Sequence, residues 1–216
     1  MSLRLFHVRH SRSFRVLWLM REMGLEGEVI SLPLDREWLA SEEWTRINPA
    51  GKVPALIDGQ TRVFESIAAM EYLCGRYGPT PLAPRPADPD YGDWLQWMHY
   101  AEAGVATHVA TLAGHRAGMA QYQVSDAHAA YLEDQIARAQ RALAARVAAG
   151  GHILARGFSA ADIAMGYTLH LMRIGRVALL PEVAAYMARL AERPHFRAAA
   201  AEGKDARRPD PALLEG

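Results

Sequence analysis

The stretch NPAGKVPALIDGQTRVFES, residues 48–66, decides the fold of this 216-residue chain. Asp58-Gly59 is a strong hairpin signal between two short predicted strands, 53–57 and 61–64. Val53-Pro54 lies where a loop enters the first strand. On spacing alone, a trans proline that opens an edge strand is the favoured interpretation. The alternative is a cis peptide, which would leave the backbone of Val53 free to pair with an extended peptide.

The residues around this stretch predict a small mixed sheet with helices. Residues 3–8 are expected to form a mostly buried strand, and apolar residues recur at helical spacing over 13–23. Residues 28–34 are strand-like again, which makes a βαβ unit with parallel strands. A short helix is expected over 37–47, and a longer one follows the hairpin over 65–77.

The second half of the chain has a different organisation. Five of the eleven residues 79–89 are prolines, which fix φ and remove donors, so this segment is expected to be a semi-rigid linker. After it we predict only helices, over 91–119, 126–149, 159–174, 181–191 and 194–201. The expected organisation is an α/β domain 1–78, a linker 79–90 and an all-helical domain 91–216.

The motif GFSAADIAM, residues 157–165, predicts a helix start. Ser159 is placed as the N-cap and Asp162 as the N3 residue of a capping box, with aspartate in place of the usual glutamate or glutamine. Phe158 and Ile163 are spaced as a hydrophobic staple. We interpret the motif as structural, without a part in chemistry.

Composition limits the classes of protein and partner. The chain has 24 basic and 24 acidic residues, so nothing indicates a nucleic-acid partner. Its single cysteine, Cys74, allows no intrachain disulfide, which suits a reducing compartment. Neither a signal peptide nor a membrane span is recognisable, and the histidines have no metal-ligand spacing. We therefore expect a cytoplasmic protein with no metal and no membrane partner.

Glu65-Ser66 follows the second hairpin strand and opens a predicted helix. A helix N-terminus has unpaired N–H groups and a partial positive charge, so it holds carboxylates well. The hydroxyl of Ser66 would add a donor. The alternative is that Ser66 is a plain N-cap serine, which on this pair alone is the better interpretation.

In their order, these pieces resemble the cytosolic glutathione transferases over essentially the whole chain. The resemblance is carried by SRSFRVLW after the first strand, NPAGKVPAL, VFESIAAMEYL, the proline-rich linker, the helical second half and GFSAADIAM. It implies a thioredoxin-like N-terminal domain, an all-helical C-terminal domain and a homodimer. It also implies glutathione as co-substrate and a small hydrophobic electrophile as second substrate.

The resemblance assigns roles to several residues. Val53, before a cis Pro54, would pair its backbone with the cysteinyl part of glutathione. Glu65 and Ser66 would hold the γ-glutamyl end, and Lys52 would contact the glycyl carboxylate. The implied electrophile pocket, between the domains, involves Trp97, Ala103, Val105 and His108. A glutathione-dependent peroxidase or dehalogenase, and a catalytically weak binding protein of this fold, are the alternative functions.

The stretch VRHSRSFRVLW, residues 8–18, is where such a family places the group that ionises the thiol. No tyrosine precedes Tyr72, and Cys74 lies in a later helix, which leaves the serine type and atypical members. Aligning the helix start places the serine at His10 or Ser11, and we favour Ser11. His10, or a backbone N–H near it, is the alternative, and Ser13 is expected to cap the helix and to lie among the glutathione-binding residues.

Overall fold

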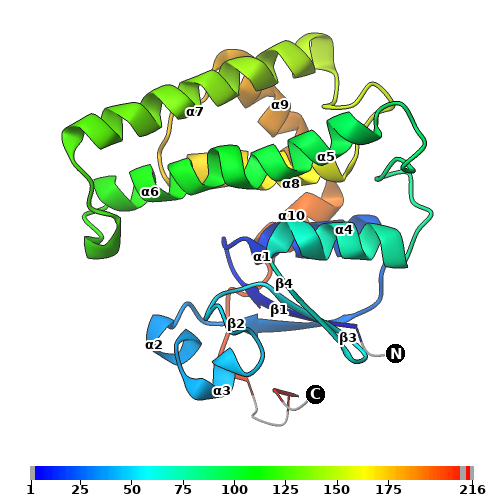
Figure 1. Cartoon of the computed structure of the whole chain (residues 1–216), viewed down its shortest axis with the longest axis vertical. Helices are drawn as coiled ribbons and strands as arrows, with labels where there is room; N and C mark the ends of the chain where they lie inside the picture. The colour runs from blue at the N-terminus through cyan, green and yellow to red at the C-terminus, as the bar shows by residue number, and fades with distance from the viewer. Residues whose placement is uncertain (1–2, 210–212, 215–216) are drawn as a thin grey trace. The chain divides into compact units, whose positions relative to one another are not determined.

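A computed structural model describes residues 3–209 and 213–214 (Figure 1). The chain divides into two compact units, Met1–Thr80 with Arg193–Gly216, and Pro81–Glu192. The first contains a mixed four-stranded sheet with helices, and the second is helical in its described elements. The predicted fold class, an α/β domain followed by an all-helical one, is confirmed.

The sheet of the first unit has the strand order β2-β1-β3-β4. Its strands are β1 (Leu3–Val8), β2 (Glu28–Leu32), β3 (Ala55–Asp58) and β4 (Thr61–Phe64). β1 and β2 are parallel, and β3 is antiparallel to both β1 and β4. The predicted βαβ unit and the predicted hairpin are both confirmed.

Helices cover both faces of this sheet. Figure 1 shows α1 (Ser13–Glu22) and α4 (Ser66–Arg76) on one face, and α2 (Arg36–Leu39) and α3 (Glu42–Thr45) on the other. The second face is closed by a buried apolar cluster that combines strand residues with indole rings. Its members are Phe6, Val8, Ile30, Leu32, Trp38, Leu39, Trp44, Ile47, Ala55 and Ile57.

The prediction of one short helix over 37–47 is wrong, because two caps divide the segment. The side chain of Asp35 accepts the Trp38 N–H at 3.0 Å and starts α2. The hydroxyl of Ser41 accepts the Trp44 N–H at 3.3 Å and starts α3. Cap residues compete with the helical ladder for the backbone, so each one opens a new turn.

The helix α10 (Pro194–Ala201) belongs to the first unit, although the sequence analysis grouped it with domain 91–216. Phe196 packs edge-on against Phe14 and Trp18 of α1, with ring centroids 5.1 and 4.9 Å apart. Arg193 forms a bidentate ion pair with Glu22, at 2.7 Å for both nitrogens. Aromatic burial and a fork-type ion pair thus hold the returning chain on α1.

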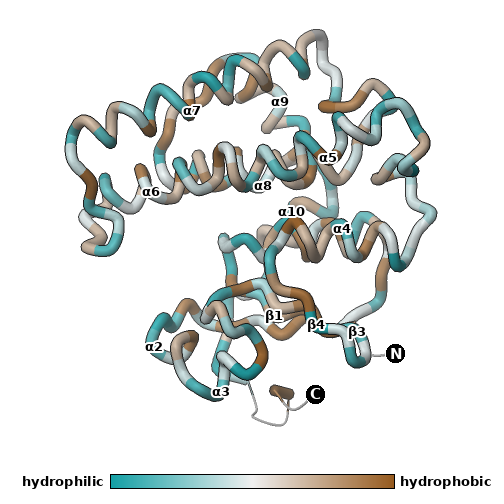
Figure 2. The backbone as a smooth tube through the Cα atoms, in the orientation of Figure 1, coloured by the Kyte–Doolittle hydropathy of each residue, from teal (hydrophilic) through white to brown (hydrophobic). Residues whose placement is uncertain are grey.

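The second unit contains α5 (Tyr91–His99), η1 (Tyr100–Ala106), α6 (Thr107–Arg116), η2 (Ala120–Tyr122), α7 (Asp126–Val147), η3 (Ala148–Gly150), α8 (Ala160–Ile174) and α9 (Pro181–Glu192). Hydrophilic and hydrophobic residues alternate along α7 in Figure 2, as expected for a helix with one buried face. Within the described residues, no helix is both long and apolar enough to cross a membrane.

The prediction of an uninterrupted helix over 91–119 is wrong. Its central turns, Tyr100–Ala106, form a π-helix. A side chain at Gly104 would collide with the ring of Tyr100, with 2.2 Å to the nearest ring atom. The hydroxyl of Thr168 donates to the carbonyl of Ala101 at 2.9 Å. A side chain of α8 therefore supplies a donor to one carbonyl of the π-helix. The close packing of Tyr100 on Gly104 and the hydrogen bond from Thr168 are contacts that helical spacing does not reveal.

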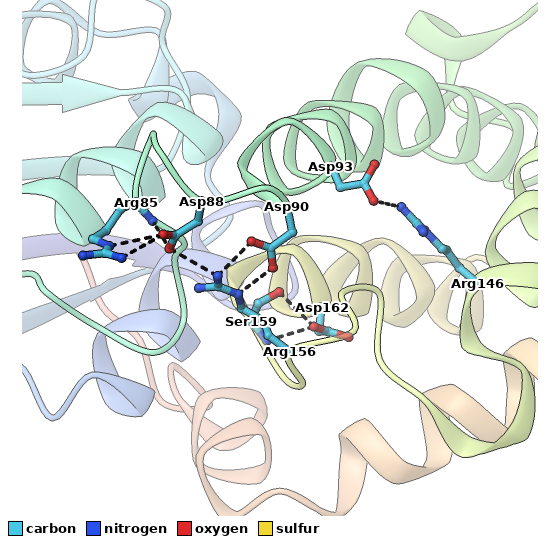
Figure 3. Close-up of polar contacts among 8 residues, drawn as sticks. All are labelled: Arg85, Asp88, Asp90, Asp93, Arg146, Arg156, Ser159 and Asp162. Carbon is cyan, nitrogen blue, oxygen red and sulfur yellow. Dashed lines mark hydrogen bonds and ion pairs between the residues drawn. The ribbon is translucent and has the colours of Figure 1, made fainter.

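Two polar clusters stabilise the segments that precede α5 and α8 in the helical unit (Figure 3). Ser159 and Asp162 form the predicted capping box, and both are fully buried. Arg156, just before it, pairs with Asp90 at 2.5 Å and with Asp88 at 3.2 Å. The segment before α5 is therefore tied to the segment before α8.

We expect Asp162→Ala to lower the free energy of unfolding by roughly 2–4 kcal/mol, because it leaves several buried donors without an acceptor. The carboxylate accepts the Ser159 N–H at 2.8 Å, the Ile153 N–H at 3.0 Å and the Tyr186 hydroxyl at 2.6 Å. Urea denaturation measures the effect. Asp134→Ala, which removes an exposed pair within α7, is the control and should cost under about 0.5 kcal/mol. Equal losses in the two variants would contradict the assignment.

Candidate functional site

The register of the sheet brings three segments of the candidate site to one edge. Ala55 lies opposite Phe6 of β1 and opposite Phe64 of β4. β1 and β4 therefore end, and β3 begins, at the same edge of the sheet. The β1–α1 loop, the loop that enters β3 and the start of α4 meet there, and all three belong to the first unit.

Ser13 is the first residue of α1, so the prediction that it is the N-cap is wrong; Arg12 occupies that position. The Ser13 hydroxyl is fully buried under the β1–α1 loop. Its Oγ lies 2.8 Å from His7 Nδ1 and 2.7 Å from Ser11 Oγ, and it accepts the Val8 N–H at 3.1 Å. Ser13 therefore organises the loop from inside.

Ser11 takes over much of the capping role. Its Oγ accepts the Ser13 N–H at 3.3 Å, and its carbonyl accepts the Phe14 N–H at 2.9 Å. Its own N–H donates to the Val8 carbonyl at 3.1 Å. The side chain is half-buried, so Ser11 presents a hydroxyl at the edge where the three segments meet.

His10, the alternative candidate, has a left-handed backbone with φ of 63°. Such a φ is uncommon for a residue other than glycine, and it turns the loop sharply before Ser11. Burial of the ring, with the nearby Arg9 guanidinium, lowers the pKa of His10 below its ordinary value. At neutral pH His10 is therefore an uncharged imidazole, and any donation from it would use a neutral N–H.

The Val53-Pro54 peptide is cis, so the interpretation as a trans proline is wrong. The preceding loop is held by Asn48, which is buried and donates to the carbonyls of Lys52 at 2.6 Å and Pro54 at 3.1 Å. Trp44 of α3 also donates to the Lys52 carbonyl, at 3.2 Å. Among the described residues, no backbone hydrogen bond is found for the N–H or C=O of Val53.

Glu65 and Ser66 open α4 in an unusual geometry. Glu65 is the N-cap residue, with φ of 76°, and its exposed side chain makes no cap hydrogen bond. Ser66 is the first helical residue, so the interpretation of Ser66 as a plain N-cap is wrong. Its Oγ is buried and has no hydrogen-bond partner in the described part of the chain. The start of α4 thus holds an unmatched hydroxyl beside a strained backbone.

The remaining predicted residues are not all in one unit. Lys52 is exposed, at the turn into β3. The residues assigned to the electrophile pocket lie in the helical unit, around η1. Trp97 and Val105 are buried, Ala103 is exposed, and His108 is half-buried with its Nδ1 2.9 Å from the Gly104 carbonyl.

Sequence reasoning missed two residues that shape the site, Asn48 and His7. Asn48 precedes Pro49 in a turn, which is a common place for a side chain that bonds nearby backbone. His7 is a fully buried polar residue in β1. The signal for Asn48 was thus its position in a turn, and the signal for His7 was a polar side chain in a strand predicted to be mostly buried.

Residues 1–74 match the family model "Glutathione S-transferase, N-terminal domain". The chain is 32% identical over 117 residues to "Glutathione S-transferase 3" of Schizosaccharomyces pombe, covering 50% of this chain. It is 26% identical over 194 residues to "Glutathione S-transferase 3" of Zea mays, covering 85% of this chain and 86% of that protein.

The chain spans 46% of the length of the S. pombe relative. It spans 35% of the "Glutathione S-transferase zeta class" protein of Euphorbia esula, at 36% identity over 78 residues. The solved glutathione transferase of Methylococcus capsulatus str. Bath has a TM-score of 0.79 at 20% identity, covering 92% of this chain and 97% of that one. The architecture is thus the glutathione-transferase fold. The match of residues 1–74, the named relatives and the solved structure together support the glutathione S-transferase family for this chain.

We expect the free energy of unfolding to fall by up to about 3 kcal/mol as the pH drops from 6.5 to 4. Burial lowers the pKa of His7 from 6.5 to about 4. The unfolded chain therefore takes up a proton in this window that the folded chain rejects. Urea titrations at several pH values measure the slope, which His7→Asn should flatten. The exposed His128→Gln is the control and should keep the wild-type slope; an unchanged slope in His7→Asn would refute this origin.

Proposed function

We propose that the protein is a glutathione transferase that ionises the thiol of glutathione for attack on small hydrophobic electrophiles. The observation that carries the proposal is the meeting of three segments at one sheet edge in a chain of this family. They supply a half-buried hydroxyl at Ser11, a backbone without hydrogen bonds at Val53 among the described residues, and the start of α4.

Each segment suits one part of the tripeptide. The N–H and C=O of Val53 pair with the cysteinyl backbone as an added strand would. Glu65 and the first turn of α4, with Ser66, hold the γ-glutamyl end, whose carboxylate is favoured at a helix N-terminus. Lys52 meets the glycyl carboxylate as an exposed cation. Ser13, buried behind Ser11, contributes through its hydrogen bonds to the loop.

The chemical demand on the site is modest. A free thiol with a pKa of about 8.5 is only about 3% ionised at pH 7. A hydrogen bond to a charged acceptor is worth roughly 1.5–3 kcal/mol, and one pKa unit corresponds to about 1.4 kcal/mol. One hydroxyl donor with a helix N-terminus nearby thus lowers the thiol pKa by about one to two units. The thiolate then attacks the electrophile, and no protein nucleophile is needed.

We expect Ser11→Ala to raise the pKa of bound glutathione by about one unit, because the thiolate loses its hydroxyl donor. Thiolate absorbance across a pH titration measures this value, and conjugation to an activated haloarene measures the turnover. His10→Ala is the matched control and should leave the pKa within a few tenths of a unit. An unchanged pKa in Ser11→Ala would exclude Ser11 as the donor.

The same assays test the function itself. Failure of the wild-type protein to bind millimolar glutathione would overturn the proposal. Binding without turnover of haloarenes, epoxides, isothiocyanates or hydroperoxides would identify a binding protein of the same fold. Turnover of hydroperoxides or dehalogenation substrates alone would identify the corresponding glutathione-dependent enzyme.

We expect Lys52→Met to weaken glutathione binding about 3- to 10-fold, in line with the loss of one exposed ion pair of about 1 kcal/mol. Calorimetric titration measures the affinity. The dipeptide γ-glutamylcysteine lacks the glycyl carboxylate, so its affinity should be the same for wild type and Lys52→Met. Lys204→Met is the control for the loss of a positive charge. A parallel loss for both ligands would show that Lys52 does not read the glycyl end.

A homodimer and a cytoplasmic location complete the proposal, both on the strength of family membership. Sedimentation equilibrium gives the mass in solution. A value near 23.9 kDa at micromolar concentration would exclude the dimer.

A further inference from the structure

A chain of three hydrogen-bonding side chains runs from the inside of the first unit to the candidate site. His7 Nδ1 lies 2.8 Å from Ser13 Oγ, which lies 2.7 Å from Ser11 Oγ. His7 and Ser13 are fully buried, and Ser11 is half-buried. We infer that His7 is a positioning residue: its Nδ1–H donates to Ser13 and thereby leaves the Ser11 proton pointing outward, toward the thiol. The inference rests on the proposed function for the identity of that ligand.

The numbers of donors and acceptors determine the direction of the hydrogen bonds between His7, Ser13 and Ser11. A hydroxyl group has one proton to donate and two lone pairs that accept. The Val8 N–H already fills one lone pair of Ser13 Oγ, at 3.1 Å. If His7 Nδ1–H fills the other, Ser11 has no lone pair left on Ser13 to donate to. The proton of Ser11 must then point away from Ser13.

The proton of Ser13 has two possible acceptors. Ser11 Oγ lies 2.7 Å away and the Val8 carbonyl 3.2 Å away. Two hydroxyl oxygens at 2.7 Å share a proton, so the shorter contact carries it. Ser11 Oγ then accepts from both the Oγ–H and, at 3.3 Å, the N–H of Ser13. Its lone pairs are engaged from inside, and only its proton remains for a ligand.

The other nitrogen of the ring decides which nitrogen of His7 carries the proton. His7 Nε2 is buried and has no hydrogen-bond partner among the described residues. In the Nδ1–H tautomer this nitrogen is an unpaired acceptor, whereas in the Nε2–H tautomer it is an unpaired donor. Buried N–H groups without a partner are the rarer case in folded proteins, so the Nδ1–H tautomer is favoured.

The Nε2–H tautomer of His7 would reverse the direction of these hydrogen bonds. Ser13 would donate to His7 Nδ1, and its free lone pair would accept the proton of Ser11. Ser11 would then present a lone pair to the ligand, which repels a thiolate. The direction of three hydrogen bonds, set by one imidazole, therefore decides whether Ser11 stabilises the thiolate or disfavours it.

The imidazole ring of His7 is neutral at the pH values at which the thiol ionises. Burial lowers the pKa of His7 to about 4, against the opposing effect of Glu202, and Arg21 and His10 lower it further. Above that pH the ring exists only as one of the two neutral tautomers. The hydrogen bond from its Nδ1–H to Ser13 can therefore persist across the pH range in which the thiol ionises.

The tautomer itself is the first test, and it needs no ligand. Long-range proton–nitrogen correlation spectra of the ¹⁵N-labelled protein assign each ring nitrogen of His7 as protonated or bare. His7→Asn identifies the resonance by its disappearance. We expect a protonated Nδ1 and a bare Nε2 between pH 6 and 8. A protonated Nε2 would overturn the inference.

The second test separates positioning from packing. We expect His7→Phe, which keeps a ring but has no donor, to raise the pKa of bound glutathione by about one unit. His7→Asn keeps an N–H near the position of Nδ1 and should hold that pKa within a few tenths of a unit. In a Ser13→Ala background, the two His7 variants should give the same thiol pKa. An unchanged pKa in folded His7→Phe, or a His7 effect that survives Ser13→Ala, would contradict the relay.

The two tests distinguish this inference from the proposed function. If wild-type protein shows no thiolate band with glutathione, the proposed function fails, and the tautomer of His7 still decides the direction of the hydrogen bonds. If glutathione is ionised normally but Nε2 carries the proton, the function stands and the role of His7 falls. Should His7→Phe fail to fold, the spectra of the wild-type ring remain decisive.

Discussion

The antiparallel pairing of β3 with both β1 and β4 is the constraint on which the candidate site depends. Because Ala55 lies opposite Phe6 on one side and Phe64 on the other, two strands end where β3 begins. A shift of one residue in either pairing would move every side chain of that strand to the other face. The register is in turn fixed by the tight turn at Gly59 and by the apolar cluster beneath the sheet.

Local patterns were enough to predict the four strands of the first unit and the start of α8 in the second. Asp58-Gly59 marked the hairpin and the GFSAADIAM motif marked the start of α8, because turn and cap chemistry act over a few residues. The division of residues 37–47 into two helices was missed although its caps are local, whereas two other failures depended on contacts between distant residues. The π-helix at Tyr100–Ala106 involves a hydroxyl from α8, and the return of α10 to α1 involves three aromatic rings. No spacing rule contains such contacts.

The candidate site divides in the same way. Val53, Glu65 and Ser66 lie at the ends of strands that the sequence predicts, and their proposed roles come from the resemblance to the family. The exchange of roles between Ser11 and Ser13 was missed because both are cap-type residues, two positions apart, and either can begin a helix. Only the burial of Ser13 and its contact with His7 show which hydroxyl remains at the edge.

Stability alone gives no reason for a polar pair at His7 and Ser13. Replacing two buried, mutually bonded polar groups by apolar groups of the same shape can be nearly neutral or even stabilising. A buried polar chain instead has a direction, since each hydroxyl must donate once and accept from the others. An apolar pair would leave the Ser11 hydroxyl free to rotate, and ordering it would then cost part of the energy of its bond to the thiolate. The buried imidazole removes that cost by fixing the proton before the ligand binds, which is preorganisation at the scale of a single hydroxyl.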